Sequence, residues 1–402
     1  MPATEIDVAI IGGGMVGASL ALALEGTGVA TLLVEGSEPA STDQPSFDDR
    51  TTALGNASRR IFQSLGVWQD LAPAAGVIRA IHVSDAGRFG FARLVAAEQG
   101  IDALGYVISN RVIGAALWKK LRAARSISLR VPARPQGIEI GTDGVKLHIG
   151  DEEVLAKLVV AADGAHSLVR TAAGIDADVE DYDQIAIVAN VVADRPHDGT
   201  AYERFTESGP LAVLPLRDGS YGVIWTCKPA RATEVLAFDD ATYLTQLQER
   251  FGWRAGRFVR TGVRASYPLK LTRAAATVAT RSVLIGNAAQ ALHPVAGQGF
   301  NLGLRDAAML AEVLAGDPRN VGSPQMLRTF SAWRAGDRAG VVRFTDGLVK
   351  MFGDARPGIG LLRNLGLLLF DLTPPAKSAL ARVSAGFAGP TPRLARGLGI
   401  RP

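Results

Sequence analysis

The chain has 402 residues, 48% hydrophobic and 20% charged, which is enough for a large core in two domains or in one domain with a big insertion. A single cysteine excludes an intrachain disulfide framework, and five histidines at no ligand-like spacing argue against a metal site. Five basic residues and no acid lie in 372–402, against a net charge of +4 for the whole chain. That basic end favours an anionic surface over nucleic acid as a partner, with a solvated tail as the alternative.

The first elements in the chain have the pattern of a dinucleotide-binding unit. In order, the sequence shows an apolar strand at 7–11, G-x-G-x-x-G at 12–17, helical spacing, and a strand at 31–34 that ends in an acid. In such a unit Gly12 permits the turn, Gly14 lets the backbone approach a pyrophosphate, and Gly17 lets the helix pack on the strand. Glu35 would accept hydrogen bonds from a ribose diol. The pattern does not distinguish FAD from NAD.

Arg50 comes next, ahead of a helix expected at 57–65. A guanidinium matches phosphate oxygens with two parallel hydrogen bonds, so Arg50 is a candidate for the diphosphate. An exposed loop arginine is the alternative. Arg111 stands at the start of a helix expected to run through Leu121, and a helix-start arginine without a ligand is the simple interpretation.

A buried strand at 158–162 leads into the sequence DGAHSLVR at 163–170. Asp163 therefore lies where a strand ends, which is the usual place for ligands in open α/β sheets. Because a carboxylate would repel a pyrophosphate, we expect Asp163 to act through hydroxyl, water or backbone donors. His166 is interpreted as a surface residue, since no neighbouring group orients it as a base.

From 185 to about 268 the apolar pattern has period two. It predicts strands at 185–192, 201–205, 211–216, 221–226 and 260–267, interrupted by a helix at 240–251. Such strands suit an antiparallel sheet inserted between the halves of a nucleotide domain. Phe205, Leu214, Pro215 and Trp225 are candidates for a substrate wall, although each one singly is better explained as core of the sheet.

The segment 283–306 predicts a strand, a glycine-rich loop and the start of a helix. Gly297, Gly299 and Gly303 leave room beside the main chain, and the N–H groups of the helix start favour an anionic or electron-rich group. An ordinary strand–loop–helix corner is the alternative.

Helices are expected at 310–314, 325–349 and 359–372. The last is apolar but short, with Arg363 and Asp371 inside it, so it suits an interfacial or core helix. We expect neither a signal peptide nor a membrane span, and hence a cytoplasmic protein with peripheral contact to the inner face of the membrane.

The three segments 12–17, 163–170 and 283–306 resemble, in the same order, the motifs of class A flavoprotein monooxygenases. Arg50-x-x-Ala-Leu, LGVW at 65–68 and GNAAQ at 286–290 resemble the ubiquinone-biosynthesis branch, of the 2-polyprenyl-6-methoxyphenol hydroxylase type. The resemblance implies FAD as cofactor, NAD(P)H as co-substrate, and contacts to FAD from Arg111 and Asp163. It also assigns the ribityl chain and pyrimidine edge of FAD to the second glycine loop, with candidate residues Gly286, Asn287, Pro294, Gly297, Gly299 and Asn301. Asn287 and Gln290 stand where the commoner family motif has Asp and His.

The resemblance also implies the fold: α/β, with a Rossmann-like FAD-binding domain like that of para-hydroxybenzoate hydroxylase. We expect residues 1–176 and 264–345 in this domain, with 75–105 contributing to the substrate side. The inserted substrate-domain sheet is expected at 177–263, and a C-terminal helical region with a basic tail at 346–402.

The implied reaction hydroxylates a polyprenylated phenol in ubiquinone biosynthesis. NAD(P)H reduces FAD, O₂ adds to give a C4a-hydroperoxide, and its terminal oxygen passes to the ring. Other enzymes of the pathway are possible partners, and the sequence identifies no catalytic residue. Three alternatives stay open: a hydroxylase of another small aromatic, a flavin reductase or dehydrogenase acting on a prenyl lipid, and a scaffold subunit that binds FAD without turnover.

Overall fold

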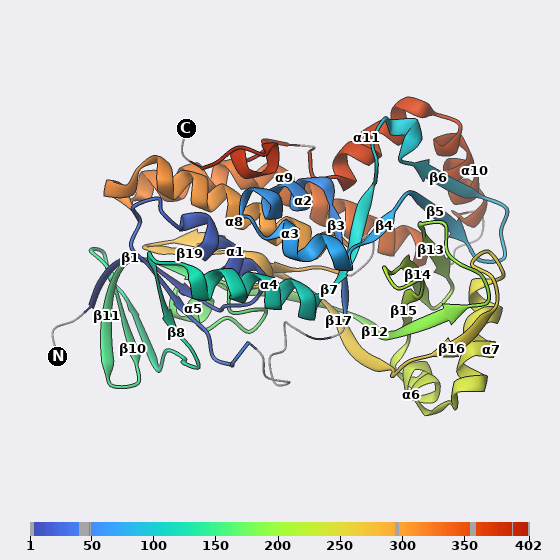
Figure 1. The fold of residues 1–402 in the computed structure, drawn as a ribbon, viewed down its shortest axis with the longest axis horizontal. Helices are drawn as coiled ribbons and strands as arrows, with labels where there is room; N and C mark the ends of the chain where they lie inside the picture. The colour runs from blue at the N-terminus through green and yellow to red at the C-terminus, as the bar shows by residue number, and fades with distance from the viewer. Residues whose placement is uncertain are drawn as a thin grey trace.

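The computed structural model describes residues 4–39, 48, 50–293, 297–353, 359–387 and 389–400. Figure 1 shows two halves along the long axis of the molecule, each built on a large sheet, with long helices lying over the first half.

The first sheet carries the N-terminal half. Its order is β18-β19-β11-β1-β2-β8, and β19, β11, β1, β2 and β8 run parallel. The inner strands are apolar on both faces, because helices cover one face and the β9–β10 hairpin the other. The strands are β1 (Thr4–Ile11), β2 (Thr31–Val34), β8 (Ile127–Arg130), β9 (Gly137–Ile140), β10 (Val145–Ile149), β11 (Glu152–Ala161), β18 (Val278–Ala279) and β19 (Ser282–Leu284).

The helices on this half are α1 (Met15–Leu24), α4 (Asn110–Ala123), α5 (Leu168–Ala172), α8 (Gln298–Gly316) and α9 (Pro324–Gly353). A small sheet with the order β3-β7-β4 lies between these helices and the second half of the molecule. It consists of β3 (Thr51–Gly55), β4 (Gly76–Ile78) and β7 (Gly105–Ser109), with α2 (Asn56–Ser64) and α3 (Trp68–Leu71) beside it.

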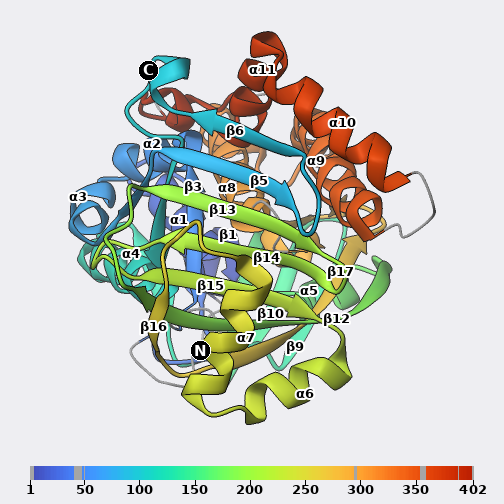
Figure 2. The same cartoon turned by 90° about the vertical axis from the view of Figure 1, so that its right-hand side faces the viewer.

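The second sheet has the order β20-β17-β12-β15-β14-β13-β5-β6, with β16 also on β12. Neighbouring strands are antiparallel except β13 and β5, because β5 and β6 enter from the 75–105 segment. The strands are β5 (Ala80–Asp85), β6 (Phe91–Val95), β12 (Ala177–Ala193), β13 (Thr200–Thr206), β14 (Gly209–Pro215), β15 (Tyr221–Cys227), β16 (Phe258–Thr261), β17 (Ala265–Ala274) and β20 (Gln290–Ala291). Helices α6 (Pro229–Ala237) and α7 (Asp240–Phe251) cover its outer face (Figure 2).

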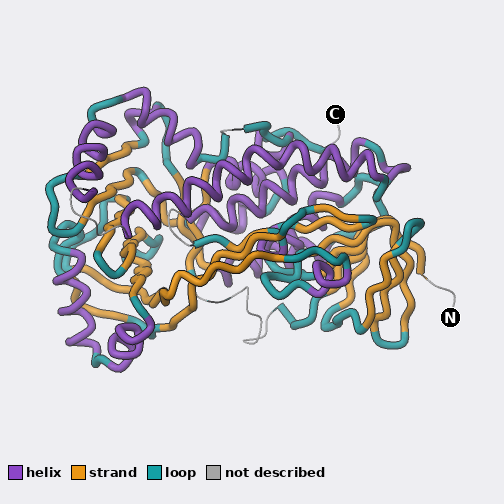
Figure 3. Tube along the Cα trace, turned by 180° about the vertical axis from the view of Figure 1, so that it is seen from behind, coloured by secondary structure: helices purple, strands orange, loops and turns teal. Residues whose placement is uncertain are grey.

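Two long strands connect the halves. β12 and β17 pair from Ala177 and Ala274 to Val188 and Ala265, and Figure 3 shows these strands running from one half into the other. A bulge between Asp181 and Gln184 interrupts the pairing. The α/β fold predicted from the sequence is confirmed. The division at 176/177 and 263/264 stays a proposal, supported by the crossing of β12 and β17.

The C-terminal helices α10 (Ile359–Asp371) and α11 (Pro374–Ser384) return to the second sheet. α10 lies along the edge strand β6 and accepts hydrogen bonds from two backbone donors, one in β6 and one just before it. Gly90 N–H donates to Asn364 Oδ1 at 2.7 Å, and Arg93 N–H donates to Asp371 Oδ1 at 2.7 Å. Lys377 pairs with Glu98 at 3.2 Å and with Asp371 at 3.5 Å, so one cation of the basic tail is used within the chain. Among the helices of the described ranges, none has the length and apolarity that a membrane span requires.

The structure differs from the sequence prediction in the second sheet and among the helices. The single strand expected at 260–267 is two strands, β16 and β17, because the chain leaves β12 at Gly262 and returns to it farther along. Helices α6 and α11 were not predicted. Both are short and begin with proline at the first positions, where a fixed φ suits a helix start.

Candidate functional site

The first glycine loop is folded too tightly for side chains. Gly12 has φ +103°, and a Cβ there would collide with the carbonyl of Ala162 at the end of β11. A Cβ on Gly17 would collide with the carbonyl of Gly12. The roles expected of Gly12 in the turn and of Gly17 in helix–strand packing therefore match the geometry.

Glu35 and Trp118 fix the middle of this loop. Gly13 N–H donates to Glu35 Oε2 at 2.6 Å, and Trp118 Nε1 donates to the Gly13 carbonyl at 3.0 Å. Gly14 is the N-cap of α1, and no side chain caps this helix start among the described residues. The N–H groups of the first turn are thus left for a ligand, which fits the pyrophosphate of FAD.

Asp163 follows β11 and lies against Gly12, since a Cβ on Gly12 would approach the Asp163 nitrogen at 2.7 Å. Its Oδ2 accepts the N–H of Leu168 at 2.8 Å. Its Oδ1 is buried without a hydrogen-bond partner in the described part of the chain. Burial raises the pKa of this carboxyl, against the lowering effect of its hydrogen bonds. A buried acceptor without a donor fits a ligand hydroxyl or a bound water at this position.

Arg170 joins this segment to the second glycine loop. Its guanidinium donates to the carbonyls of Ala165 at 2.8 Å and Ala288 at 3.1 Å. Ser167 caps α5 by accepting the Arg170 N–H at 3.0 Å. Both residues therefore brace the backbone that surrounds Asp163.

The second glycine loop packs directly on α1. Gly286 has φ +57°, and a Cβ on Gly286 or Gly303 would press on Val16. Asn287 is exposed, whereas its neighbours Gly286 and Ala288 are buried. Gly297, with φ +59°, is the N-cap of α8, and Gly299 lies in the first turn. Pro294 lies outside the described residues.

Asn301 is buried and fully hydrogen-bonded within the protein. Its Oδ1 accepts Gly55 N–H at 2.9 Å and Ser58 Oγ–H at 2.6 Å. Its Nδ2 donates to the carbonyls of Ala53 at 2.8 Å and Gly297 at 2.7 Å. An amide has two donors and two acceptor positions, so this side chain has no capacity left for FAD. Any contribution of Asn301 to the site is made by holding β3 against the loop.

A buried ion network supports the second loop from behind. Arg334 of α9 and Asp306 of α8 form a 2.7 Å ion pair, and Asp337 binds both Arg334 and Arg305. Asp306 Oδ2 also accepts Gln290 Nε2 at 3.0 Å, and Gln290 Oε1 accepts Arg338 Nε at 2.6 Å. Sequence reasoning missed this network. The ion pairs between α8 and α9 join residues 28 and 32 positions apart in sequence, so no local pattern marks them.

Arg50 and Arg111 both meet Asp48. Arg50 Nε lies 2.6 Å from Asp48 Oδ2, and its guanidinium stacks 4.4 Å from the centre of the Tyr267 ring. Arg111 N–H donates to the Asp48 carbonyl at 3.0 Å. Tyr267 belongs to β17, so these two arginines lie where the small sheet, α4 and the second sheet come together.

His293 makes a polar contact between the halves. Its Nε2 lies 3.2 Å from Gln184 Oε1, and the Tyr182 ring is edge-on to it at 5.2 Å. Burial lowers the pKa of His293 to about 4, so the imidazole is neutral at pH 7. Tyr182 OH in turn donates to Asp346 Oδ1 at 3.3 Å. The bulge in β12 brings Tyr182 and Gln184 to this place, and no sequence pattern predicts it.

The second sheet separates the four candidates for a substrate wall. Trp225 and Phe205 are buried, and Trp225 packs with Tyr243 of α7 on the outer face. Pro215 is buried at the end of β14. Leu214 belongs to the inner cluster with Ile78 and Ala53, on the side of the small sheet. Leu214 therefore lies on the inner side of the sheet, and Trp225 belongs to the core.

The family described as "FAD binding domain" matches residues 5–345. A ubiquinone hydroxylase, UbiL, of Rhodospirillum rubrum is 36% identical over 98% of this chain and 93% of its own length. The chain belongs to this family of FAD-dependent hydroxylases. The 3-demethoxyubiquinol 3-hydroxylase of Escherichia coli K12 is 34% identical over 94% of this chain and 98% of its own length.

The solved structure of p-nitrophenol 4-monooxygenase PnpA from Pseudomonas putida has the same fold. It matches with a TM-score of 0.79 at 21% identity, over 96% of this chain and 99% of its own. Because the chain belongs to this family, it is a flavoprotein monooxygenase with FAD as its cofactor.

Proposed function

We propose that this flavoprotein hydroxylates the aromatic ring of a polyprenylated phenol in ubiquinone biosynthesis, using NAD(P)H and O₂. The observation that carries the proposal is the junction of the halves. There the second glycine loop places a buried neutral His293 against Gln184, and the inner face of the second sheet carries apolar residues such as Leu214 and Ile224. A prenylated phenol is polar at one end and apolar over the rest. The junction likewise has a polar part, His293 and Gln184, and an apolar part on the inner face of the sheet.

Bound FAD would supply the activation of O₂ for transfer to the ring. We propose that the FAD site is formed by Gly12, Gly14, Gly17, Glu35, Arg50, Arg111, Asp163, Gly286, Asn287, Pro294, Gly297, Gly299 and Asn301, by contact or by positioning. The first loop and the start of α1 would hold the pyrophosphate, and Asp163 Oδ1 would accept a hydroxyl or water. Asn301 would act by positioning, as its hydrogen bonds require.

The apolar inner face would exclude water from the reacting ring, and Gln184 would orient the imidazole of His293. Gln184 Nε2 donates to the Ser208 carbonyl at 3.4 Å, so its Oε1 is the atom that faces His293, and His293 Nε2 carries the proton. NAD(P)H would bind transiently, since the sequence has no second G-x-G-x-x-G.

Product analysis tests the reaction. Purified holoenzyme is supplied with NADH or NADPH and a short-chain prenylated methoxyphenol, with and without O₂, and the products are analysed by mass spectrometry. The proposal expects a product heavier by one oxygen atom that takes up label from ¹⁸O₂. Turnover of a prenyl lipid without O₂ would identify a reductase or dehydrogenase instead, and FAD binding with no turnover would identify a scaffold subunit.

Replacing Gly14 tests the first loop. In Gly14→Val the side chain occupies the space where the backbone meets the pyrophosphate, so we expect loss of bound FAD with little change in folding. Flavin absorbance of the purified protein and calorimetric titration with FAD measure this. Gly336→Val is the matched control, because nothing lies within 4 Å of a Cβ at Gly336. Unchanged FAD affinity in Gly14→Val would show that the loop faces another ligand.

A polyprenylated phenol is nearly insoluble, so we also propose a peripheral contact with the inner face of the membrane or with other enzymes of the pathway. Leu369 and Leu372, 65% and 70% exposed at the end of α10, supply apolar surface for it.

A further inference from the structure

The end of the second sheet that lies away from the FAD-binding half carries exposed aromatic and cationic side chains. Figure 2 looks onto this end, where β5 and β6 lie beyond the cover of α7. Phe91 of β6 is 37% exposed, and Trp253 in the turn after α7 is 67% exposed. We call the surface formed by His82, Phe91, Arg93, Trp253, Arg254 and Arg257 the end face.

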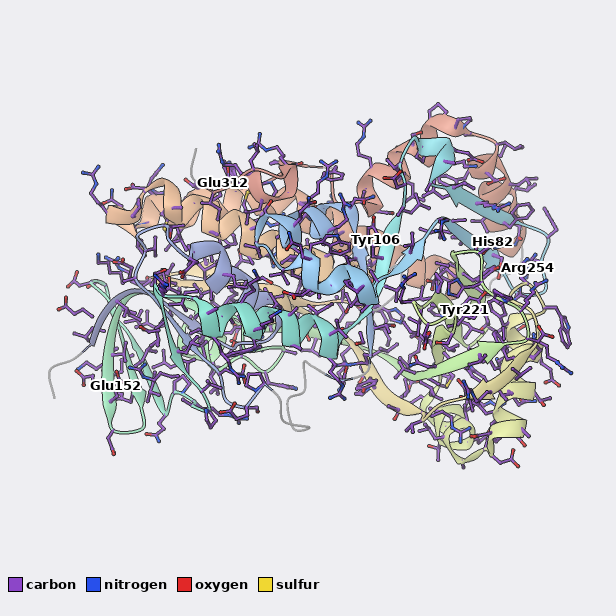
Figure 4. All side chains as sticks on the ribbon, viewed as in Figure 1. His82, Tyr106, Glu152, Tyr221, Arg254 and Glu312 are labelled. Atoms are coloured by element: carbon purple, nitrogen blue, oxygen red, sulfur yellow. The ribbon has the colours of Figure 1, made fainter. Side chains whose placement is uncertain are left out.

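Contacts join these residues into one surface. The rings of Phe91 and His82 stack at 5.5 Å, and His82 lies 6.0 Å from the Tyr202 ring. Tyr202 OH donates to the Arg254 carbonyl at 3.5 Å. Figure 4 shows His82 and Arg254 together at this end of the molecule.

The turn itself is anchored. Arg195 Nη2 donates to the carbonyls of Trp253 at 3.3 Å and Arg254 at 2.5 Å. Trp253 is therefore presented to solvent by a backbone that the sheet holds in place.

The end face is cationic. The chain has no acidic residue between Glu249 and Asp306. Arg93, Arg254 and Arg257 are exposed. In the described ranges no acidic side chain pairs with Arg254, and Arg257 has a loose 3.7 Å pair with Asp194. Burial lowers the pKa of His82, and the positive charge of Arg254 lowers it further, which agrees with a concentration of cations here.

We propose that the end face docks on an anionic lipid bilayer. Tryptophan and phenylalanine beside arginine form the pattern of a membrane interface, where the rings enter the headgroup region and the guanidiniums bind lipid phosphates. The exposed Leu365 and Leu369 of α10, which lies along β6, extend the apolar surface at the same edge. The inference deepens the proposed function, since a prenylated substrate resides in the bilayer.

Co-sedimentation of the full-length holoenzyme with vesicles tests the end face. One set of vesicles is phosphatidylcholine, and the other is phosphatidylcholine mixed with phosphatidylglycerol, each at low and at high salt. The double variant Arg254→Glu/Arg257→Glu is compared with Arg122→Glu/Arg125→Glu, which makes the same change of charge on exposed residues of the FAD-binding half. Arg122 also has a loose 3.7 Å pair, with Glu38, so the two doubles are matched.

We expect the wild type to sediment with the anionic vesicles at low salt and to be released by high salt. The Arg254→Glu/Arg257→Glu variant should bind about 30-fold less tightly or worse, and the control should bind like the wild type. Trp253→Ser should weaken binding while leaving its salt dependence unchanged.

Equal losses in the two doubles would overturn the proposal. Failure of the wild type to bind anionic vesicles would overturn it too, even if an acidic protein were found to bind the end face. Flavin absorbance verifies that each variant is folded. Vesicle binding through these residues without hydroxylation of any phenol would contradict the proposed function but would support docking through the end face.

Discussion

The two glycine loops assigned to FAD are held in place in different ways. The first is fixed by nearby partners, the Glu35 carboxylate and the Trp118 indole, on elements next to it in the sheet and its helix layer. The second is supported by charges buried between α8 and α9, with Asp306 accepting both Gln290 and Arg334. The structure of the first loop is thus specified by its own sequence, and that of the second loop by packing between helices.

The largest expected effect comes from removing the charge behind the second loop. In Arg334→Met, Asp306 loses its cation while still fully buried, so we expect a loss of about 3–5 kcal/mol in the free energy of unfolding. FAD should also bind more weakly, because Arg334 no longer holds Asp306 in the position that binds Gln290. Chemical denaturation and FAD titration measure the two effects. Arg328→Met, an exposed change on the same helix, should alter stability by no more than about 0.5 kcal/mol. A stable Arg334→Met with normal FAD affinity would show that packing alone supports the loop.

The free energy of unfolding, measured as a function of pH, tests the contribution of His293 in the second loop. The pKa of His293 is about 4 when folded and 6.5 at its ordinary value, so between these values the unfolded chain binds a proton that the folded chain does not. Its contribution to stability is therefore complete above pH 6.5 and is lost as the pH falls towards 4. From pH 7 to pH 5 the loss should be about 2 kcal/mol.

The variant His293→Asn should remove this part of the pH dependence, as measured by denaturation at both pH values. His166→Asn, at an exposed position, should keep it. If His293→Asn retains the full dependence, other groups are responsible.

The smallest effect is expected in the first loop. Trp118→Phe keeps an aromatic ring but loses the donor to the Gly13 carbonyl, at a cost of about 1 kcal/mol in unfolding free energy. Trp333→Phe on α9, where the side chain is 39% exposed, is the control. A loss in Trp118→Phe as large as that in Arg334→Met would contradict the difference between the loops.

The sequence predicted those parts of the fold that local patterns determine. The first strand, glycine loop, helix and second strand lie where G-x-G-x-x-G and the following acid indicate, and α7 begins and ends at the predicted residues, Asp240 and Phe251. The apolar period of two from 185 to about 268 predicted the antiparallel sheet. The Gly12 and Gly17 roles also followed, because both depend on close approach within one unit.

Contacts between distant segments could not be predicted. The bulge that brings Tyr182 and Gln184 to His293 depends on the pairing of β12 with β17, and Asp183 adopts φ +52° there without being glycine. Arg50 also stacks on Tyr267, which is distant in sequence and belongs to the second sheet. Asn301 is a further example. The motif predicts that this residue belongs to the FAD site, but not that its side chain makes four hydrogen bonds within the protein.

Helix α10 has a consequence for solubility. β6 is the last strand of its sheet, and α10 covers it by accepting from the N–H groups of Gly90 and Arg93. A strand edge with free donors is a template for pairing with another chain. A protein cut before Ile359 would present that edge, with the exposed Phe91 on it, and would self-associate through added strands. Sedimentation of such a truncated chain would then report aggregation between copies, and point substitutions on the surface of α10 are the sound way to study this helix.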